Sequence, residues 1–127
     1  MEDIDYQVGI QKKIIADIQS SYVTIFKNYP VKNITTIGQS PRYAQINQLL
    51  VPLHNIMAIY HGHINKLYEG FITSFDAEMG DVEPVNIKLD QFSSIYYVDM
   101  VTTSQQIYLL NEEKRELEVK LNYKFPV

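Results

Sequence analysis

The stretch that decides the fold covers residues 40–78 and has the sequence SPRYAQINQLLVPLHNIMAIYHGHINKLYEGFITSFDAE. Its apolar residues recur at alternating spacings of three and four, which is the pattern of a long amphipathic helix. This seam consists of Tyr43, Ile46, Leu50, Leu53, Met57, Tyr60, Ile64, Leu67 and Phe71. Ser40 can cap the first turn, and Pro41 suits the first helical position because it lacks an N–H donor. We therefore predict a helix over about 41–78.

Pro52 and two glycines leave alternatives open within this helix. A proline inside a helix removes one hydrogen bond and costs about 3 kcal/mol. The helix could therefore kink at Pro52, or break at Val51 and restart. The seam keeps its phase across Pro52, which favours one kinked helix. Gly62 and Gly70 indicate either close approach of another helix or tolerated glycines, since each costs about 1 kcal/mol relative to alanine.

The segment 43–65 contains no Asp, Glu, Lys or Arg. It is nevertheless too polar to span a membrane, because it holds several Gln, Asn and His residues. An exposed helix face is usually charged. We therefore expect this segment to be covered on more than one side.

Two further helices are predicted. The first covers about 3–29, where Ile4, Val8, Ile15, Ile18, Tyr22, Ile25 and Tyr29 form a seam that Ile14, Val23 and Phe26 widen. The other covers about 85–124, with Val85, Leu89, Phe92, Tyr96, Met100, Thr103, Ile107, Leu110, Leu117 and Leu121. The fold class is thus all-α and coiled-coil-like. We predict a single domain over 1–127, in which helices 41–78 and 85–124 form an antiparallel hairpin and helix 3–29 packs on its proximal half.

The helix lengths predict an asymmetry. A uniform antiparallel hairpin with its turn near residue 81 places Phe71 opposite Gln91 or Phe92, and the first helix reaches only to about Lys66. The distal tip carries Leu67, Phe71, Ile72, Phe75, Val85, Leu89 and Phe92. An exposed apolar patch of this size marks a partner site. We predict that these seven residues bind a second copy or another protein; the alternative is that a displaced helix covers them.

Composition narrows the function classes. The net charge of −4 does not favour nucleic-acid binding, and the absence of cysteine excludes disulfides and thiolate metal sites. The start of the sequence is acidic and there is no long apolar run, so we predict no signal peptide and no membrane segment. We therefore expect a cytoplasmic or particle-associated protein. The excess of lysine over arginine and the many isoleucines are typical of AT-rich bacterial and phage genomes.

No catalytic, cofactor or metal site is predicted. His54 and His61 share a helix face but lie about 10 Å apart along its axis, and His61 and His63 diverge. We interpret the three histidines as buried polar or interface residues. The acidic residues near the turn, among them Asp76, Glu78, Asp81 and Glu83, could dock a basic partner or form a solvated turn.

The segment Ser40-Pro41-Arg42-Tyr43-Ala44-Gln45-Ile46, followed by Ile64-Asn65-Lys66-Leu67, resembles the central helical hairpin of small terminase subunits of T4-like phages. The resemblance covers residues 40–67, and no flanking segment matches. It implies a ring-forming regulator of DNA packaging.

The sequence as a whole predicts a non-enzymatic helical interaction protein without cofactors. We expect it to self-associate, as a homo-oligomer, or to dock as a small component of a larger phage or bacterial complex. The alternatives are a nucleic-acid-linked oligomer, such as a packaging subunit, and a small inhibitor that binds a protein partner.

Overall fold

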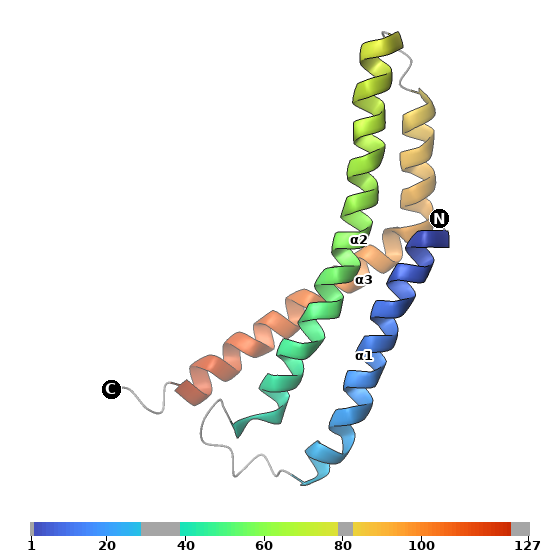
Figure 1. The fold of residues 1–127 in the computed structure, drawn as a ribbon. Helices are drawn as coiled ribbons and strands as arrows, with labels where there is room; N and C mark the ends of the chain where they lie inside the picture. Colours follow the sequence, from blue (N-terminus) through green and yellow to red (C-terminus); the bar gives the residue numbers. More distant parts are fainter. Residues whose placement is uncertain (1, 29–38, 79–82, 123–127) are drawn as a thin grey trace.

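The computed structural model describes residues 2–28, 39–78 and 83–122, and the side chains of residues 3–28, 39–67 and 90–121. These residues form three helices, α1 (Glu2–Asn28), α2 (Pro41–Glu78) and α3 (Glu83–Asn122) (Figure 1). The prediction of an all-α fold with three long helices is confirmed. The predicted helix ends at residues 29 and 124 lie outside the described residues.

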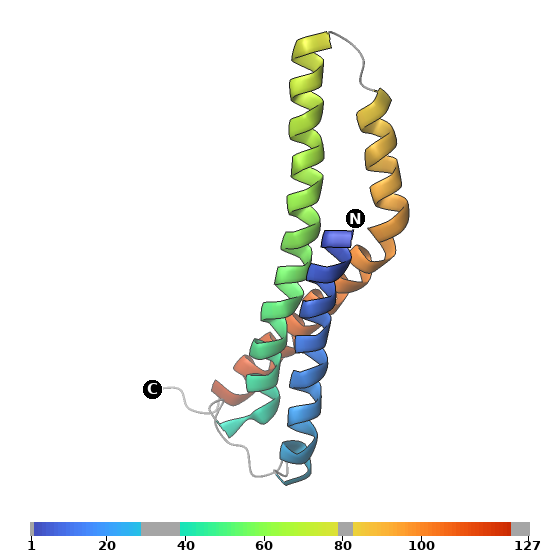
Figure 2. The same ribbon diagram turned by 45° about the vertical axis from the view of Figure 1, so that its right-hand side comes forward.

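The helix α2 is the central element, because α1 and α3 both pack against it and diverge from each other toward the C-terminal end of α1 (Figures 1 and 2). α1 lies beside the N-terminal half of α2, while α3 runs antiparallel to α2 (Figure 1). The predicted hairpin with α1 on its proximal half is confirmed. The charge-free half of α2 is covered from two sides, also as predicted.

The beginning of α2 has the predicted cap. The backbone N–H of Tyr43 donates to Ser40 Oγ at 3.1 Å, and that of Ala44 donates to the Ser40 carbonyl at 3.2 Å. The helix then continues without a break through Pro52, whose side chain is fully buried. Burial of the proline ring among apolar neighbours offsets part of the cost of the missing hydrogen bond. The alternative of a break at Val51 is therefore wrong.

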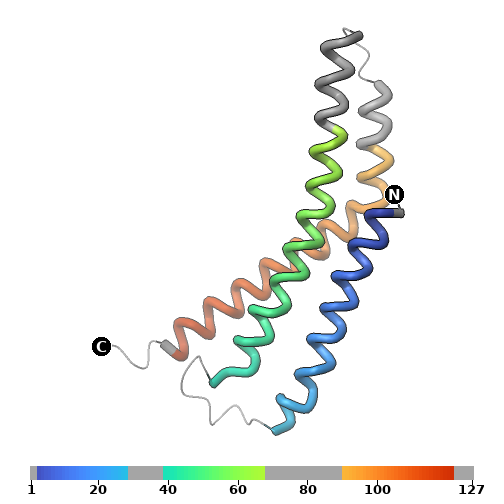
Figure 3. Tube along the Cα trace, in the orientation of Figure 1, coloured from blue at the N-terminus to red at the C-terminus, as the bar shows by residue number. Residues whose placement is uncertain are grey.

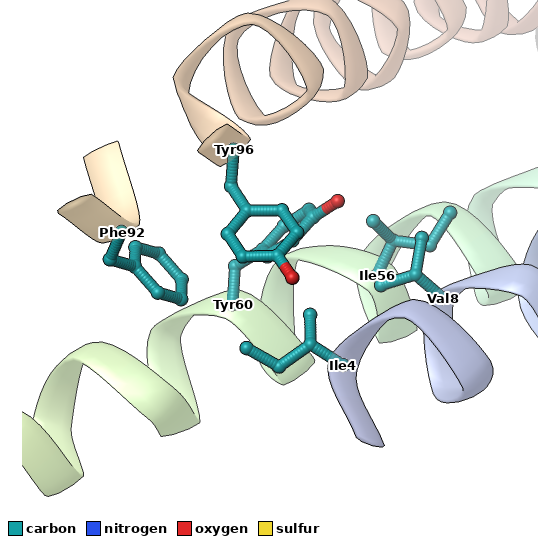
Figure 4. Close-up of a cluster of buried hydrophobic side chains, with 6 residues drawn as sticks. All are labelled: Ile4, Val8, Ile56, Tyr60, Phe92 and Tyr96. Atoms are coloured by element: carbon teal, nitrogen blue, oxygen red, sulfur yellow. The ribbon is translucent and has the colours of Figure 1, made fainter. Parts of the chain in front are cut away.

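One cluster of buried side chains joins all three helices. It consists of Ile4, Val8, Ile56, Tyr60, Phe92 and Tyr96, two from each helix (Figure 4). The ring centroids of Phe92 and Tyr96 lie 4.9 Å apart, and those of Tyr60 and Tyr96 lie 5.3 Å apart. Tilted pairs at these distances are favourable beyond the area that they bury.

A second part of the core lies along the N-terminal half of α2. Its buried residues are Ile46, Leu49, Leu50 and Leu53 on α2, with Tyr22 on α1 and Thr103 and Leu121 on α3. The predicted seams are therefore confirmed where side chains are described. Ile14, Val23 and Phe26 are exposed instead of widening the buried face of α1.

The helix α3 changes direction partway along its length, and beyond this bend it crosses α2 (Figures 1 and 3). Within α3, Ser94 Oγ donates to the Gln91 carbonyl at 3.0 Å. A serine that bonds back to its own helix often bends that helix.

The register of the described part of the hairpin differs from the predicted one. Phe92 packs against Tyr60 and His63, with ring centroids at 6.2 and 6.4 Å, and not opposite Phe71 as a uniform antiparallel pair requires. The predicted register is therefore wrong. Arg42 and Glu113 pair with the same offset as His63 and Phe92, so the whole described part of the hairpin is shifted from the predicted register.

Gly62 on α2 lies at the surface with open space around it. A Cβ atom built at this position meets nothing within 4 Å. The interpretation of Gly62 as a site of close helix approach is therefore wrong within a single chain, and the glycine is a tolerated one.

We predict that Gly62→Ala raises the free energy of unfolding by about 1 kcal/mol, because alanine loses less backbone entropy in a helix than glycine does. Urea denaturation followed by circular dichroism measures this gain. Gly9→Ala on α1, which is equally open, serves as a control with the same expected sign. A loss of stability in Gly62→Ala alone would show that another surface packs against this position.

Candidate interaction surface

The structure describes the side chains of two of the seven residues predicted to form a partner site at the distal tip. Phe92 is 3% exposed and belongs to the three-helix core, so a partner cannot reach it in this fold. Leu67 is half-buried against the same cluster. The side chains of Phe71, Ile72, Phe75, Val85 and Leu89 lie outside the described residues, and for them the partner site stays a prediction.

A different exposed apolar surface lies on α3. Its members lie between residues 95 and 109 of the helix. They are Ile95, Tyr97, Val98, Val101, Tyr108 and Leu109, with exposed fractions between 46% and 74%. Single exposed apolar residues are normal, but six within fifteen positions of one helix form a contiguous patch of the kind that marks binding sites. We call these six residues the α3 face.

A groove runs along one edge of the α3 face. It is lined by Met57 of α2 and by Tyr97, Met100, Val101, Ser104, Gln105 and Tyr108 of α3, and its volume is about 600 Å³. Methionine side chains adapt their shape to a partner, and tyrosine combines a large apolar ring with a polar tip. Both residue types are enriched at protein interfaces. The groove can therefore accept apolar side chains from a protein partner.

The α3 face is also nearly free of charge. Asp99 is the one charged residue in the segment 91–111. Its Oδ1 accepts from Lys12 Nζ at 3.0 Å, and its Oδ2 accepts from the hydroxyl of Tyr60. The segment 43–65 on α2 has no charge at all, and the segment 91–111 on α3 has this single one. The spacing of apolar residues on α3 indicates only its buried side, so the pattern alone does not reveal the α3 face.

The three-helix junction that contains Asp99 fixes the position of the α3 face. Tyr60 comes from α2, Lys12 from α1 and Asp99 from α3, so one carboxylate joins all three helices. Burial and the hydrogen bond to Asp99 raise the pKa of Tyr60. The phenol therefore stays protonated and keeps donating. Beside Tyr60, the hydroxyl of Tyr96 donates to Asp5 Oδ1 at 3.0 Å. Burial is the larger cause that raises the pKa of Tyr96, and the bond to Asp5 adds to it.

An ion pair holds the other end of α3 against the start of α2. Arg42 Nε and Nη2 donate to the two carboxylate oxygens of Glu113 at 2.5 and 2.8 Å, and Nη1 donates to Gln45. The hydrogen bond to Glu113 raises the pKa of Arg42, and the same bond lowers the pKa of Glu113. Nearby, Tyr43 donates to Glu118 at 3.2 Å.

The histidines form no common site. His54 and His61 are exposed, so they are not buried polar residues. Their interpretation as interface residues stays a prediction. His63 stacks on Phe92. Burial is the larger cause that lowers the pKa of His63, and repulsion from Lys66 adds to it. Within the residues that the structure describes, no three His, Cys, Asp or Glu side chains are grouped so that they could hold a metal ion.

A second groove lies between α1 and α2. Gln7, Ile10, Gln11, Asn55, Ala58 and Ile59 line it, and its volume is about 450 Å³. The amide of Asn55 donates to Gln11 Oε1 at 3.1 Å, so part of its polar lining is already paired within the chain. Its exposed apolar area is smaller than that of the α3 face, because Ile10 is the main exposed apolar residue in it.

Comparison with known proteins gives no relative: no protein family, no curated protein and no solved structure matches this chain. Among the described parts of the three helices, none is both long and apolar enough to cross a membrane.

We predict that Tyr60→Phe lowers the free energy of unfolding by about 1.5 kcal/mol, because it removes a hydrogen bond to a charged acceptor at the junction. Urea denaturation measures the loss. Tyr6→Phe, at a residue that is 73% exposed, is the matched control and should change stability by less than about 0.5 kcal/mol. Equal effects in the two variants would contradict a structural role for the Tyr60 hydroxyl.

We predict that Glu113→Gln lowers stability at pH 7 by about 0.5–1 kcal/mol, a value kept small because both partners are partly solvated. Since pairing lowers the pKa of Glu113 in the fold, the contribution is present above the ordinary carboxyl pKa and is lost as the pH falls through the lowered one. Wild type and variant should therefore converge in acid, as measured by urea denaturation between pH 7 and 3.

Glu112→Gln is the control for this pair. Glu112 bonds to Arg115 within α3 at 3.0 Å, and the Arg115 side chain is 70% exposed. Such a pair contributes only a few tenths of a kcal/mol. If Glu112→Gln costs as much as Glu113→Gln, the contact between α2 and α3 is not what the measurement detects.

Proposed function

We propose that this chain is a non-enzymatic helical interaction protein that self-associates or docks as a small component of a larger protein complex. The observation that carries the proposal is the α3 face, which combines exposed apolar side chains with an almost complete lack of charge. A solvated helix face of this length normally carries several charges.

The composition of the α3 face supports a protein partner. Interface cores are depleted in charged residues and enriched in tyrosine and methionine. Tyr97 and Tyr108 are 64% and 62% exposed, and Met57 and Met100 line the groove beside them. Burying these side chains against a second protein would remove apolar area from water, and each square ångström contributes about 25 cal/mol before the costs of association.

Several charged groups bond between helices. Asp5, Asp99 and Glu113 each accept a hydrogen bond from a residue of another helix. This use of carboxylates is typical of a scaffold, in which polar side chains fix the geometry of an apolar docking surface. A scaffold of this kind fits a component of a phage or bacterial assembly, in the cytoplasm or within a particle, as the composition suggests.

Light scattering coupled to gel filtration tests the proposal. The chain has a mass of 14.8 kDa, and we expect a defined multiple of it across a range of concentrations and salt levels. Because the α3 face is uncharged, salt should not dissociate the assembly. The proposal fails if two results occur together. The mass stays at 14.8 kDa, and Val98→Asp, at a residue that is 74% exposed, leaves the binding of every co-purified protein unchanged.

A further inference from the structure

One line of exposed residues on α3 has the same series of intervals whether it is read from its N-terminal end or from its C-terminal end. Tyr97, Val101, Ser104 and Tyr108 follow one another at intervals of four, three and four, and all of them are exposed. Intervals of three and four keep residues on one side of a helix, so these four form a straight seam. All four also line the groove beside Met57.

This symmetry matches what a two-fold interface needs. In such an interface the same patch of each copy meets itself, and each residue pair occurs twice. When two copies of α3 are laid antiparallel, with the axis between Thr102 and Thr103, Tyr97 of one copy faces Tyr108 of the other and Val101 faces Ser104. The aromatic residues then pair at the two ends, and the small residues lie at the centre, where the helices approach most closely.

The electrostatics of the seam permit this contact. A face that carries net charge repels a copy of itself, and like charges brought together cost free energy. The segment 91–111 holds one charge, Asp99, and Lys12 of the same chain compensates it at 3.0 Å. Two α3 faces can therefore meet without opposing like charges.

The size of the surface is in the range of a specific contact. A standard interface buries about 800 Å² on each partner. A buried aromatic side chain covers roughly 150–250 Å², so the exposed parts of Tyr97 and Tyr108 supply about a third of this area. Ile95, Val98 and Leu109, which expose more than half of their surface, flank the seam and can supply much of the remainder. α1 contributes no lining residue to the groove, so a second copy has access to it.

From the self-complementary spacing, the lack of charge and the area, we infer that the chain forms a two-fold symmetric dimer in which the α3 helices pair antiparallel along the seam Tyr97–Val101–Ser104–Tyr108. This inference rests on the proposed function and names its partner, a second copy of the chain.

The first test places a charge at the centre of the seam. Val101→Asp brings two carboxylates close to the two-fold axis and should convert the dimer into a 14.8 kDa monomer by light scattering, with unchanged helicity by circular dichroism. Val23→Asp is the matched control. It makes the same substitution on α1, where the residue is 54% exposed against 46% for Val101, and the dimer should persist.

The second test fixes the orientation and does not depend on a disruptive variant. The chain has no cysteine, so a single introduced cysteine can be cross-linked only between copies. In the antiparallel pair, the two copies of residue 104 lie about 5 Å apart along the axis, and the two copies of residue 111 lie about 25 Å apart. A short bismaleimide should therefore link Ser104→Cys and leave Asn111→Cys unlinked.

Each outcome decides the inference. A dimer that Val101→Asp dissociates, together with cross-linking at 104 alone, supports it. Cross-linking at both positions shows a parallel pair and overturns the orientation. An oligomer that persists in Val101→Asp, or that Val23→Asp dissociates, overturns the α3 seam while leaving the proposed function intact. A wild-type chain that remains monomeric at millimolar concentration overturns the dimer, and co-purification then decides the proposed function separately.

Discussion

The structure depends on the junction at which Asp99 of α3 accepts hydrogen bonds from Tyr60 of α2 and Lys12 of α1. A carboxylate that is partly removed from water is stabilised by pairing, and here two different helices supply the partners. The aromatic cluster around Tyr60 and Tyr96 packs beside the carboxylate, while the bond to Lys12 lies at the surface. Polar pairing and apolar packing thus fix the same point of the molecule, and this is where α1 and α3 meet.

The position of the junction determines which surfaces remain outside. Because α3 bends beside it and then crosses α2, the helix buries Phe92, Tyr96 and Thr103 and turns its opposite side to solvent (Figure 1). The pair Arg42–Glu113 fixes the far end of the same arm. The uncharged α3 face is therefore held on a helix anchored at two places, which is the rigid support that a docking surface requires.

Much of the fold follows from sequence pattern, and the reasons are local. Helix length, the cap at Ser40 and the buried seams depend on spacings within one helix, which the sequence displays directly. The register of Phe92 against α2 depends on how two helices meet, and no spacing within one helix encodes it. The α3 face likewise depends on how two helices meet. The sequence shows that 91–111 holds a single charge, but it does not show which side of the helix is free until α2 occupies the other side.

The arrangement of α1 and α3 around α2 also bears on how the chain folds. Most contacts join helices that are neighbours in sequence, and contacts of this kind form quickly because little loop entropy is lost. The bonds between α1 and α3 are different, since Asp5 and Tyr96 are separated by 91 positions and Lys12 and Asp99 by 87. Two helical pairs can therefore assemble early and independently on α2. We expect the junction to close last, because its bonds join residues that are far apart in sequence, and its closure then joins the two helical pairs into one cooperative unit.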